Sequence, residues 1–270
     1  MRDPSVQLDA MSTPATAETF EIAFDRVTKR FTIGNEVITA IQDLSFRIRK
    51  KEIVSFVGKT GCGKSTTFKL LTGLEAPTEG RIVVDGSDPH ADFGDFRSRF
   101  GMVFQTDRLL EWRTSLQNVT VGLEILGYEK SKREEIGRKW LNEVGLEGYE
   151  NAYPHQLSGG MRQRVAISRA FSVDPDILLC DEAFGHLDEI TAVHLRQVFR
   201  RLVEETGKTA LVITHDIKEA LELGHRIVVL GRPARVLYDA PILKFGSLDE
   251  RQAFEQKVFN VIDRDAGDMK

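Results

Sequence analysis

Residues 58–66 read GKTGCGKST, and they follow directly on the apolar run EIVSFV at 52–57. Glycine loses more conformational freedom on folding than any other residue, so three glycines in one short turn indicate a special backbone conformation or the close approach of another group. The turn fits the pattern G-x-x-x-x-G-K-[ST], whose backbone cradles a chain of phosphates. Packing alone could also account for a glycine-rich turn. The β-rich residues before it and the helix-compatible STTFKLL after it favour a phosphate-binding loop.

The chemistry of this loop follows from its residue types. Successive backbone N–H groups would form an anion-binding nest, and the helix that begins near Lys64 would add its positive N-terminal end and finish at Gly73. The Lys64 ammonium would reach the β- and γ-phosphates, while the Ser65 hydroxyl would ligate Mg²⁺. The predicted nucleotide-binding residues are Gly58, Lys59, Thr60, Gly61, Cys62, Gly63, Lys64, Ser65 and Thr66.

Length and charge limit the remaining possibilities. The chain has 270 residues and a formal net charge of −4, which suits one large domain or two small ones and gives no reason to expect a nucleic-acid partner. No run approaches the roughly 18–20 apolar residues that a membrane-spanning helix needs. Residues 1–19 lack the apolar stretch of a secretion signal, and we expect them to be a disordered extension. We expect the two cysteines, Cys62 and Cys180, to be small buried side chains of a protein in a reducing compartment, rather than metal ligands or nucleophiles.

Strand-like segments surround the loop on both sides in sequence. They lie at 20–27, 37–48, 81–86 and 99–104. Their apolar alternation predicts a mostly antiparallel patch beside the nucleotide core.

The sequence becomes helical from about 107 to 172. Within SKREEIGRKWLNEVG (131–145), three apolar residues recur on one helical face. Ser131 and Glu134 have the spacing of a capping box, and Gly145 is placed to end the helix.

Short apolar strands then return at 176–182, 209–214 and 226–231, separated by helical stretches near 188–205 and 216–223. Strands that are apolar on both faces and alternate with helices predict a parallel sheet covered on both sides. The expected fold class is therefore α/β, of the P-loop NTPase kind.

The strand DILLCDE (176–182) ends in two adjacent carboxylates. Asp181 is suited to the Mg²⁺ shell, and Glu182 could polarise a water molecule for attack on the γ-phosphate. The alternative is a solvated strand end followed by a turn. The phosphate-binding loop upstream makes the catalytic interpretation the stronger one.

A second anion site is indicated by LSGGMRQRVAISRA (157–170), which places Ser158, Gly159 and Gly160 at the start of a helix. One nucleotide needs only one phosphate loop, so a second site suggests contact with the ATP of another subunit.

Here the sequence resembles the ATP-binding cassette (ABC) family, and the resemblance covers about residues 20–230. It rests on an LSGG-Q-type signature between a phosphate loop and a strand ending in Asp-Glu. The resemblance implies a RecA-like core with an antiparallel β subdomain and an α-helical subdomain. It also implies an ATPase domain over 20–240 with its helical part at about 107–172, and a partly helical C-terminal tail over 241–270. ATP, Mg²⁺ and a second copy of the chain are the implied ligands and partner.

Further family elements lie where the resemblance predicts them. Gln105 matches a glutamine that touches Mg²⁺ and the attacking water, Asp188 matches a residue at the subunit boundary, and His215 matches a histidine that contacts the γ-phosphate. Phe31 stands where the family places an aromatic ring on the adenine. Phe31 could instead belong to the core. His215 could instead be a structural neighbour of the helix start at Asp216.

Two substitutions depart from the family pattern, which has proline and alanine where this chain has Ala183 and His186. Loss of proline removes a φ restraint and should loosen the turn slightly, and His186 could alter contacts at the subunit boundary or their response to pH. Neither change removes a group that the chemistry needs.

The segment 104–127 resembles importer ATPases of the nitrate, sulfonate, taurine and bicarbonate type. In that resemblance Trp112 and its neighbours line a groove where a transmembrane permease docks, and the pair Asn118-Val119 follows. Packing of Trp112 inside the helical region is the alternative.

The sequence therefore predicts an ABC importer ATPase on the cytoplasmic face of the bacterial inner membrane, coupled to a permease and indirectly to a periplasmic solute-binding protein. The transported solute would be a small anion such as nitrate, sulfonate or bicarbonate. Two rivals are a soluble ABC ATPase that acts on DNA or ribosomes and a regulatory cassette that binds ATP without hydrolysis. The first rival usually has duplicated cassettes, long coiled coils or zinc insertions, and the intact Glu182 weakens the second.

Overall fold

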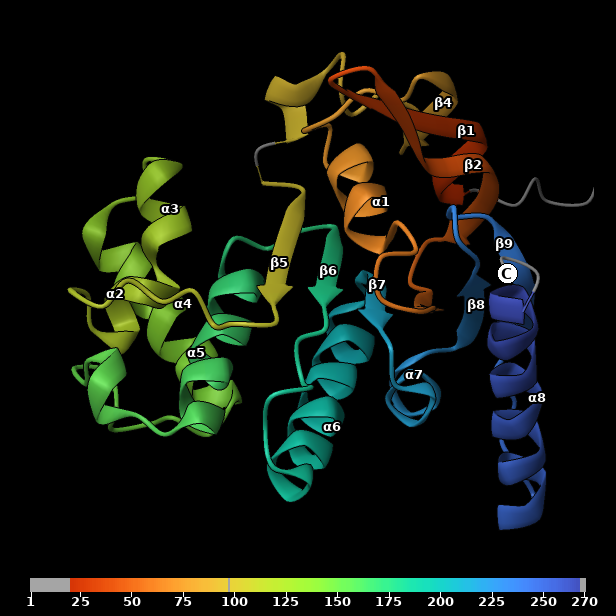
Figure 1. Ribbon diagram of the computed structural model, residues 1–270. Helices are drawn as coiled ribbons and strands as arrows, with labels where there is room; N and C mark the ends of the chain where they lie inside the picture. The colour runs from red at the N-terminus through yellow and green to blue at the C-terminus, as the bar shows by residue number, and fades with distance from the viewer. Residues whose placement is uncertain (1–19, 97, 268–270) are drawn as a thin grey trace, which may run out of the picture.

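Two sheets of different character organise the chain (Figure 1). A computed structural model describes residues 20–96 and 98–267. The extension expected over 1–19 lies outside the described residues. Within the described part of the chain, no helix is long and apolar enough to cross a membrane.

The larger sheet has six strands in the order β5-β6-β7-β3-β8-β9. Their bounds are Ile53–Val57 (β3), Phe100–Phe104 (β5), Ile177–Asp181 (β6), Thr209–Thr214 (β7), Arg226–Leu230 (β8) and Val236–Pro241 (β9). All pairs are parallel except β8 with β9. Every residue of β3 and β7 is buried, as strands covered on both faces require. The parallel sheet predicted from the apolar runs is confirmed.

The smaller sheet is antiparallel, with the order β2-β1-β4. Its strands are Phe20–Ile33 (β1), Glu36–Arg49 (β2) and Glu79–Val84 (β4). The predicted antiparallel patch is thus present, but the prediction that 99–104 belongs to it was wrong. That segment forms β5, which pairs in parallel with β6 as far as Phe104 opposite Asp181. Its alternating residues Met102 and Val103 contribute to the two cores on opposite faces of the parallel sheet.

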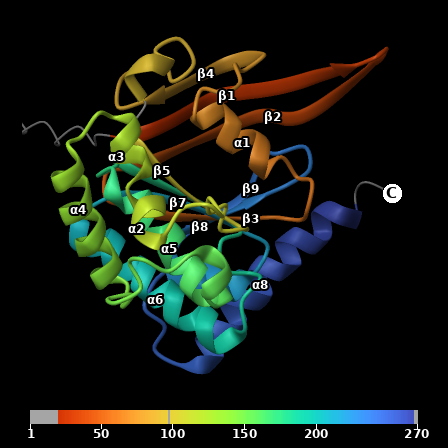
Figure 2. The same ribbon diagram turned by 90° about the vertical axis from the view of Figure 1, so that its left-hand side faces the viewer.

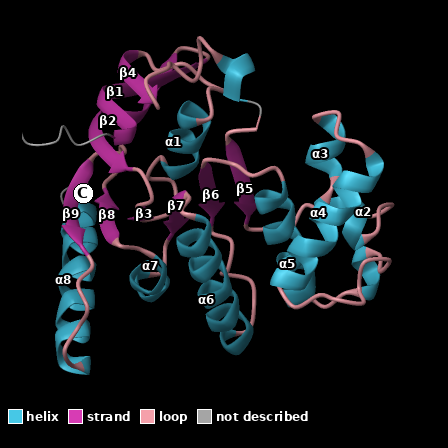
Figure 3. Cartoon of the chain, turned by 180° about the vertical axis from the view of Figure 1, so that it is seen from behind, coloured by secondary structure: helices cyan, strands magenta, loops and turns pink. Residues whose placement is uncertain are grey.

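Four helices gather beyond the β5 edge of the parallel sheet, as Figures 1 and 3 show. They are Ser115–Val119 (α2), Val121–Ile125 (α3), Lys130–Glu143 (α4) and Gly159–Ser172 (α5), with a short 3₁₀ turn at Pro154–Gln156.

The capping box expected at Ser131 and Glu134 is not formed. Helix α4 begins at Lys130, so its N-cap is Glu129, two residues before Ser131, with no side-chain cap bond within the described chain. Glu134 instead lies within 4 Å of basic side chains one turn away on either side. A capping box occurs at α2, where Thr114 and Gln117 bond reciprocally. The expected helix end is correct, because Gly145 follows α4 with φ of +73°.

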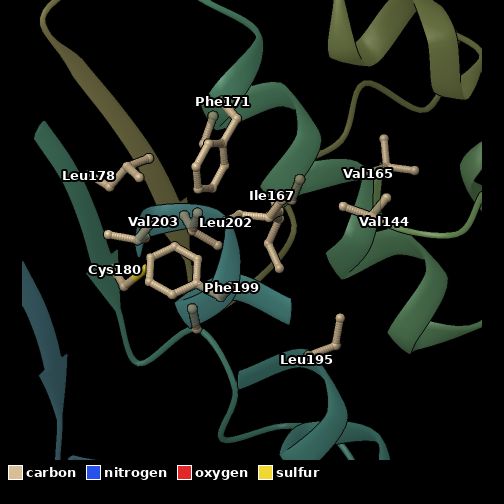
Figure 4. Packing of buried hydrophobic residues seen from close by; sticks show 14 of the residues in the cluster. Val144, Val165, Ile167, Phe171, Leu178, Cys180, Leu195, Phe199, Leu202 and Val203 are labelled. Carbon is tan, nitrogen blue, oxygen red and sulfur yellow. The ribbon is translucent and has the colours of Figure 1, made fainter. Parts of the chain in front are cut away.

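The helices α6 (Glu189–Thr206) and α5 cover one face of the parallel sheet. Figure 4 shows Phe199 between the sheet residue Cys180 and Phe171 of α5. The ring centroid of Phe199 lies 6.1 Å from that of Phe171 and 5.9 Å from that of Phe184. Helix α1 (Lys64–Leu71) packs on the opposite face, in one core with the antiparallel sheet. A 3₁₀ turn at Phe93–Phe96 lies between β4 and β5.

The C-terminal part of the described chain is a long helix. Helix α8 (Leu248–Gly267) runs along the β8–β9 edge and also packs on α7 (Ile217–Leu223). Figures 1 and 2 show α8 as a separate rod beside the sheet. Val258, at its centre, is completely buried.

Candidate functional site

The loop between β3 and α1 has a backbone that only glycine suits at two points. Gly63, the N-cap of α1, has φ of +100°, and a Cβ there would lie 2.6 Å from the Ala40 carbonyl oxygen. A Cβ on Gly58 would lie 2.7 Å from the Leu230 carbonyl oxygen. The Lys64 ammonium turns back into the loop and donates to the carbonyl oxygen of Gly58 at 2.6 Å. The loop therefore holds a buried cation against its own backbone at the N-terminal end of α1, an end that favours anions.

Three adjacent strands bring the predicted chemistry together. Strand β3 leads into the phosphate loop, β6 ends at Asp181-Glu182, and β7 ends just before His215. Because β6, β7 and β3 are parallel neighbours, their carboxyl ends lie at one edge of the sheet (Figure 1). Ligands of open α/β sheets bind at this edge.

The Glu182 carboxylate lies close to two other predicted site residues. Its carboxylate oxygen Oε2 lies 3.3 Å from Nδ1 of His215 and 3.5 Å from Nε2 of Gln105. Its backbone has φ of +48°, an uncommon conformation for a non-glycine residue, and its N–H donates to the Ile213 carbonyl at 2.8 Å. The predicted base therefore lies within 3.5 Å of both Gln105, predicted to touch the attacking water, and His215, predicted to contact the γ-phosphate. His215 is also next to a helix N-cap, because Asp216 accepts hydrogen bonds from the first turn of α7.

Asp181 is a half-buried carboxylate with a raised pKa. Burial is the main cause and the neighbouring charge of Glu182 adds to it, while Lys64 acts in the opposite direction. The Asp181 carboxylate at the end of β6 and the Ser65 hydroxyl at the start of α1 are hard oxygen donors of the kind that Mg²⁺ prefers. Among the described residues no group of three His, Cys, Asp or Glu side chains could enclose a metal ion. The binding of Mg²⁺ by Asp181 and Ser65 stays a prediction.

The residues predicted from sequence to form a second anion site line a separate cavity of about 560 Å³. Ser158 is the N-cap of α5, and its hydroxyl accepts from the N–H of Met161 at 3.3 Å. Gly159 and Gly160 line the cavity together with Asp188 and His186. Asp188 is the N-cap of α6, and the hydrogen bond from the N–H of Thr191 lowers its pKa. This cavity shares no lining residue with the cavity at the phosphate loop.

Gln163 is a site residue whose contacts the sequence did not reveal. It is 4% exposed, and its Nε2 donates to the carbonyl oxygens of Phe104 at 3.1 Å and Ala183 at 2.7 Å. It therefore ties the signature helix α5 to the residues immediately before Gln105 and after Glu182. The glutamine of the signature motif was the signal that could have suggested this bridge.

Phe31 lies on β1 opposite Ile38 of β2 and is partly exposed. The Lys29 ammonium stands 5.0 Å from the centre of its ring. The cavity at the phosphate loop, of about 250 Å³, is lined by Ile38, Thr39 and Ala40 rather than by Phe31. The ring is thus near the loop cavity through its strand partner, and its contact with a base stays a prediction.

Trp112 is 73% exposed, so it is not packed inside the helical region. It lines a groove of about 500 Å³ between α2 and α4. The groove is mostly polar and contains more basic than acidic side chains. Its charged members are Arg113, Glu124, Lys130, Arg133, Glu134 and Arg138.

Comparison with known proteins is consistent across sequence and structure. Residues 41–185 match the family described as ABC transporter. An uncharacterized ABC transporter ATP-binding protein of Methanocaldococcus jannaschii is 40% identical over 217 residues, covering 80% of each chain. A taurine import ATP-binding protein of Pelagibacter ubique is 39% identical, over 80% of this chain and 81% of its own. A dimeric ATP-binding cassette bound to ADP and Pi in a post-hydrolysis state superposes with a TM-score of 0.74 at 35% identity, over 83% of this chain and all of that one.

Proposed function

The chain belongs to the ABC transporter family and is an ATPase of the ABC type; from that premise we propose that it is the ATP-hydrolysing subunit of an importer, acting as a dimer with a separate permease. One observation carries the catalytic part of the proposal. Glu182 follows the half-buried Asp181 without an intervening residue and faces both His215 and Gln105 within 3.5 Å.

Each side chain then has a distinct task in hydrolysis. A water molecule that attacks the γ-phosphate would give its proton to Glu182, while His215 fixes the phosphate and Gln105 orients the water. Lys64 neutralises phosphate charge from within the loop. Mg²⁺, held by Ser65, Gln105 and Asp181, would neutralise the charge that develops on the phosphate oxygens.

The signature cavity supports the dimeric part of the proposal. Ser158 and its two glycines lie in a cavity separate from the chain's own phosphate loop. They would therefore contact the γ-phosphate of the nucleotide held by a second copy, with Asp188 at the boundary between the two chains. Phe31 would stack on the adenine at the other end of each nucleotide.

The groove at Trp112 supports the permease as partner. An exposed tryptophan in a hollow surface is the kind of anchor that a partner helix covers. The basic balance of the groove suits an acidic or polar docking segment. Residues 20–240 would form the ATPase domain, with the helical subdomain at about 107–172 reaching the permease and 241–270 as the C-terminal tail.

The solute and the location follow from the same proposal. The name of the Pelagibacter relative supports import of a small anion of the sulfonate type, and nitrate and bicarbonate belong to the same proposed class. A periplasmic binding protein would deliver the solute to the permease. The subunit itself would lie on the cytoplasmic face of the membrane, without a nucleic-acid partner.

Replacing Glu182 tests the catalytic assignment. We expect Glu182→Gln to keep ATP affinity and to lower the ATPase rate by about 100-fold or more, because the water loses its base. The same variant should accumulate an ATP-bound dimer in size-exclusion chromatography. Glu147→Gln, at an exposed position, is the control and should hydrolyse ATP like the unmodified protein. Near-normal hydrolysis by Glu182→Gln would overturn the assignment.

A further inference from the structure

The turn between β8 and β9 lies against the phosphate loop. The carbonyl oxygen of Leu230 lies 2.7 Å from the position that a Cβ on Gly58 would take, and the Cβ of Ala234 lies 2.8 Å from that of a Cβ on Gly63. Hydrogen bonds with the backbone of Ala40 and Gln42 also join Ala234 to β2. The turn is therefore a fixed wall of the nucleotide cavity.

Arg232 is the charged residue of this wall. Arg232 and Pro233 line the loop cavity together with Gly61, Lys64 and Ser65. The Arg232 guanidinium lies 4.0 Å from the position that a Cβ on Gly61 would take. The side chain is exposed, and within residues 20–96 and 98–267 its guanidinium has neither a hydrogen bond nor an ion pair. A free guanidinium beside an anion-binding nest is placed to bind phosphate oxygens.

The backbone of Arg232 is held from α8. Asp265, with a side chain only 10% exposed, accepts from the N–H of Arg232 at 3.1 Å and from Nη2 of Arg235 at 2.5 Å. Arg235 in turn donates from Nη1 to the carbonyl oxygen of Arg232 at 3.0 Å. Asp265 also lines a small cavity behind the loop with Lys59 and Thr60. The C-terminal helix thus fixes the turn that presents the free guanidinium.

The position of the cavity limits which part of a nucleotide Arg232 can meet. The phosphate loop holds the β- and γ-phosphates, and in the proposed function the base lies against Phe31, on the strand next to Ile38. The cavity lies between these two points, since Ile38 and the start of α1 both line it. The part of the nucleotide that crosses it is the ribose and the phosphate nearest to it.

We propose that Arg232 is a nucleotide-binding residue that contacts the phosphate nearest the ribose, and that Asp265 on α8 is the residue that positions it. The proposal rests on the proposed binding of ATP at the loop. It assigns to the C-terminal helix a part in nucleotide affinity, although α8 lies outside the matched segment 41–185.

The test measures dissociation constants of the full chain for ATP, ADP and adenosine by calorimetry, with steady-state kinetics in parallel. Arg232→Ala should weaken ATP and ADP by about the same factor, on the order of tenfold, because a charge-assisted hydrogen bond to a phosphate common to both is lost. Adenosine, which has no phosphate, should be unaffected. The KM for ATP should rise while kcat changes little. Arg232→Lys keeps the charge and should recover part of the affinity.

Asp265→Asn tests the positioning role. It should weaken ATP and ADP in the same direction, and adding it to Arg232→Ala should produce little further loss, because both changes act through one guanidinium. Arg264→Ala removes one positive charge from the neighbouring position on α8 and should bind all three ligands normally.

Each outcome decides between the proposals. An unmodified chain that binds no ATP would overturn both the proposed function and this inference. If the unmodified chain binds ATP but the ATP affinity of Arg232→Ala is unchanged within about twofold, the inference alone is overturned. It is also overturned if Arg264→Ala loses as much ATP affinity as Arg232→Ala. An equal loss of adenosine binding would also overturn it, because the effect would then be on the base or the fold rather than on a phosphate.

Discussion

Glu219 lies on α7, one turn after His215, and is only 3% exposed. Burial is the largest cause that raises its pKa to about 7, with Asp216 and Glu182 contributing in the same direction. A hydrogen bond with Thr214 and the charge of Arg196 act against the shift. Its Oε1 has no hydrogen-bond partner among the described residues. In the folded protein this carboxyl group is therefore protonated to a large extent near neutral pH, where an ordinary glutamate is fully ionised.

A pKa raised on folding fixes the sign of the pH dependence. The stability that Glu219 contributes is fully present below its ordinary pKa of 4.5, and it is lost as the pH rises through about 7. The loss at pH 8 is at most about 3 kcal/mol. Glu219→Gln, which imitates the protonated form, should unfold at higher denaturant than the unmodified protein at pH 8, with a smaller difference at pH 5. Unfolding curves with EDTA measure this. Identical pH dependence in both proteins would contradict the assigned pKa, and Glu147→Gln serves as the exposed control.

At the scale of elements, sequence patterns identified where strands form more reliably than which strands pair with one another. The run at 209–214 coincides with β7, because a short strand buried on both faces has an unmistakable apolar composition. The run at 99–104 was also recognised as a strand, but local alternation does not say which sheet edge it will join. The N-cap of α4 lies two residues before the predicted Ser131, a size of error common at helix ends.

In the candidate site, too, local sequence patterns could be recognised while contacts between distant segments could not. The loop at 58–66 and the Asp-Glu pair could be predicted because each function needs fixed residue types at fixed spacing. The position of Arg232 at the loop cavity could not, and the signature motif marked Gln163 without revealing its partners, since these contacts join segments far apart in sequence that meet only in the folded chain. Helix α8 was expected as no more than a partly helical tail, and nothing local indicated its contact with the turn at Arg232.

Trp112 allows a test of the helical region as a docking element. We expect Trp112→Ala to leave the melting temperature and ATP affinity of the isolated chain unchanged, because the side chain is 73% exposed. Assembly with the permease should weaken by a factor of 10 or more, on the order of the loss for a buried tryptophan anchor. Pull-down with the co-expressed permease measures this.

Phe93→Ala removes an aromatic side chain that is 50% exposed on another part of the surface and is the matched control. Unfolding of Trp112→Ala would show that the ring is structural. Normal assembly by Trp112→Ala would move the docking site elsewhere.

At the scale of the whole molecule, the proposed function assigns each chain two half-sites rather than one complete site. The phosphate loop and the signature residues line different cavities, so each nucleotide of a dimer would need one half-site from each chain. Lys64→Ala would disable the loop of its own chain, and Ser158→Arg would obstruct the nucleotide of its partner. Either variant alone should therefore be inactive as a homodimer.

Mixing the two inactive variants distinguishes a shared site from a private one. In a mixed dimer both lesions fall in one composite site, which leaves the other site intact. We expect the mixture to recover up to about a quarter of normal ATPase activity, because half of randomly paired dimers are mixed and each has one working site. If Ser158 served its own chain's nucleotide, every site would have a lesion. No recovery despite demonstrated mixed dimers would contradict the composite site.

The order of strands in the large sheet affects when, during synthesis, the chain becomes able to bind a nucleotide. Strand β3, which leads into the phosphate loop, is placed between β7 and β8, two strands made much later in synthesis. A ribosome adds roughly 5–20 residues per second, so β3 waits many seconds for its neighbours. During that interval the apolar strand is a hazard for misassembly. Nucleotide binding then indicates that β7 and β8 have joined the sheet, and free ATP would stabilise the finished chain relative to incomplete chains.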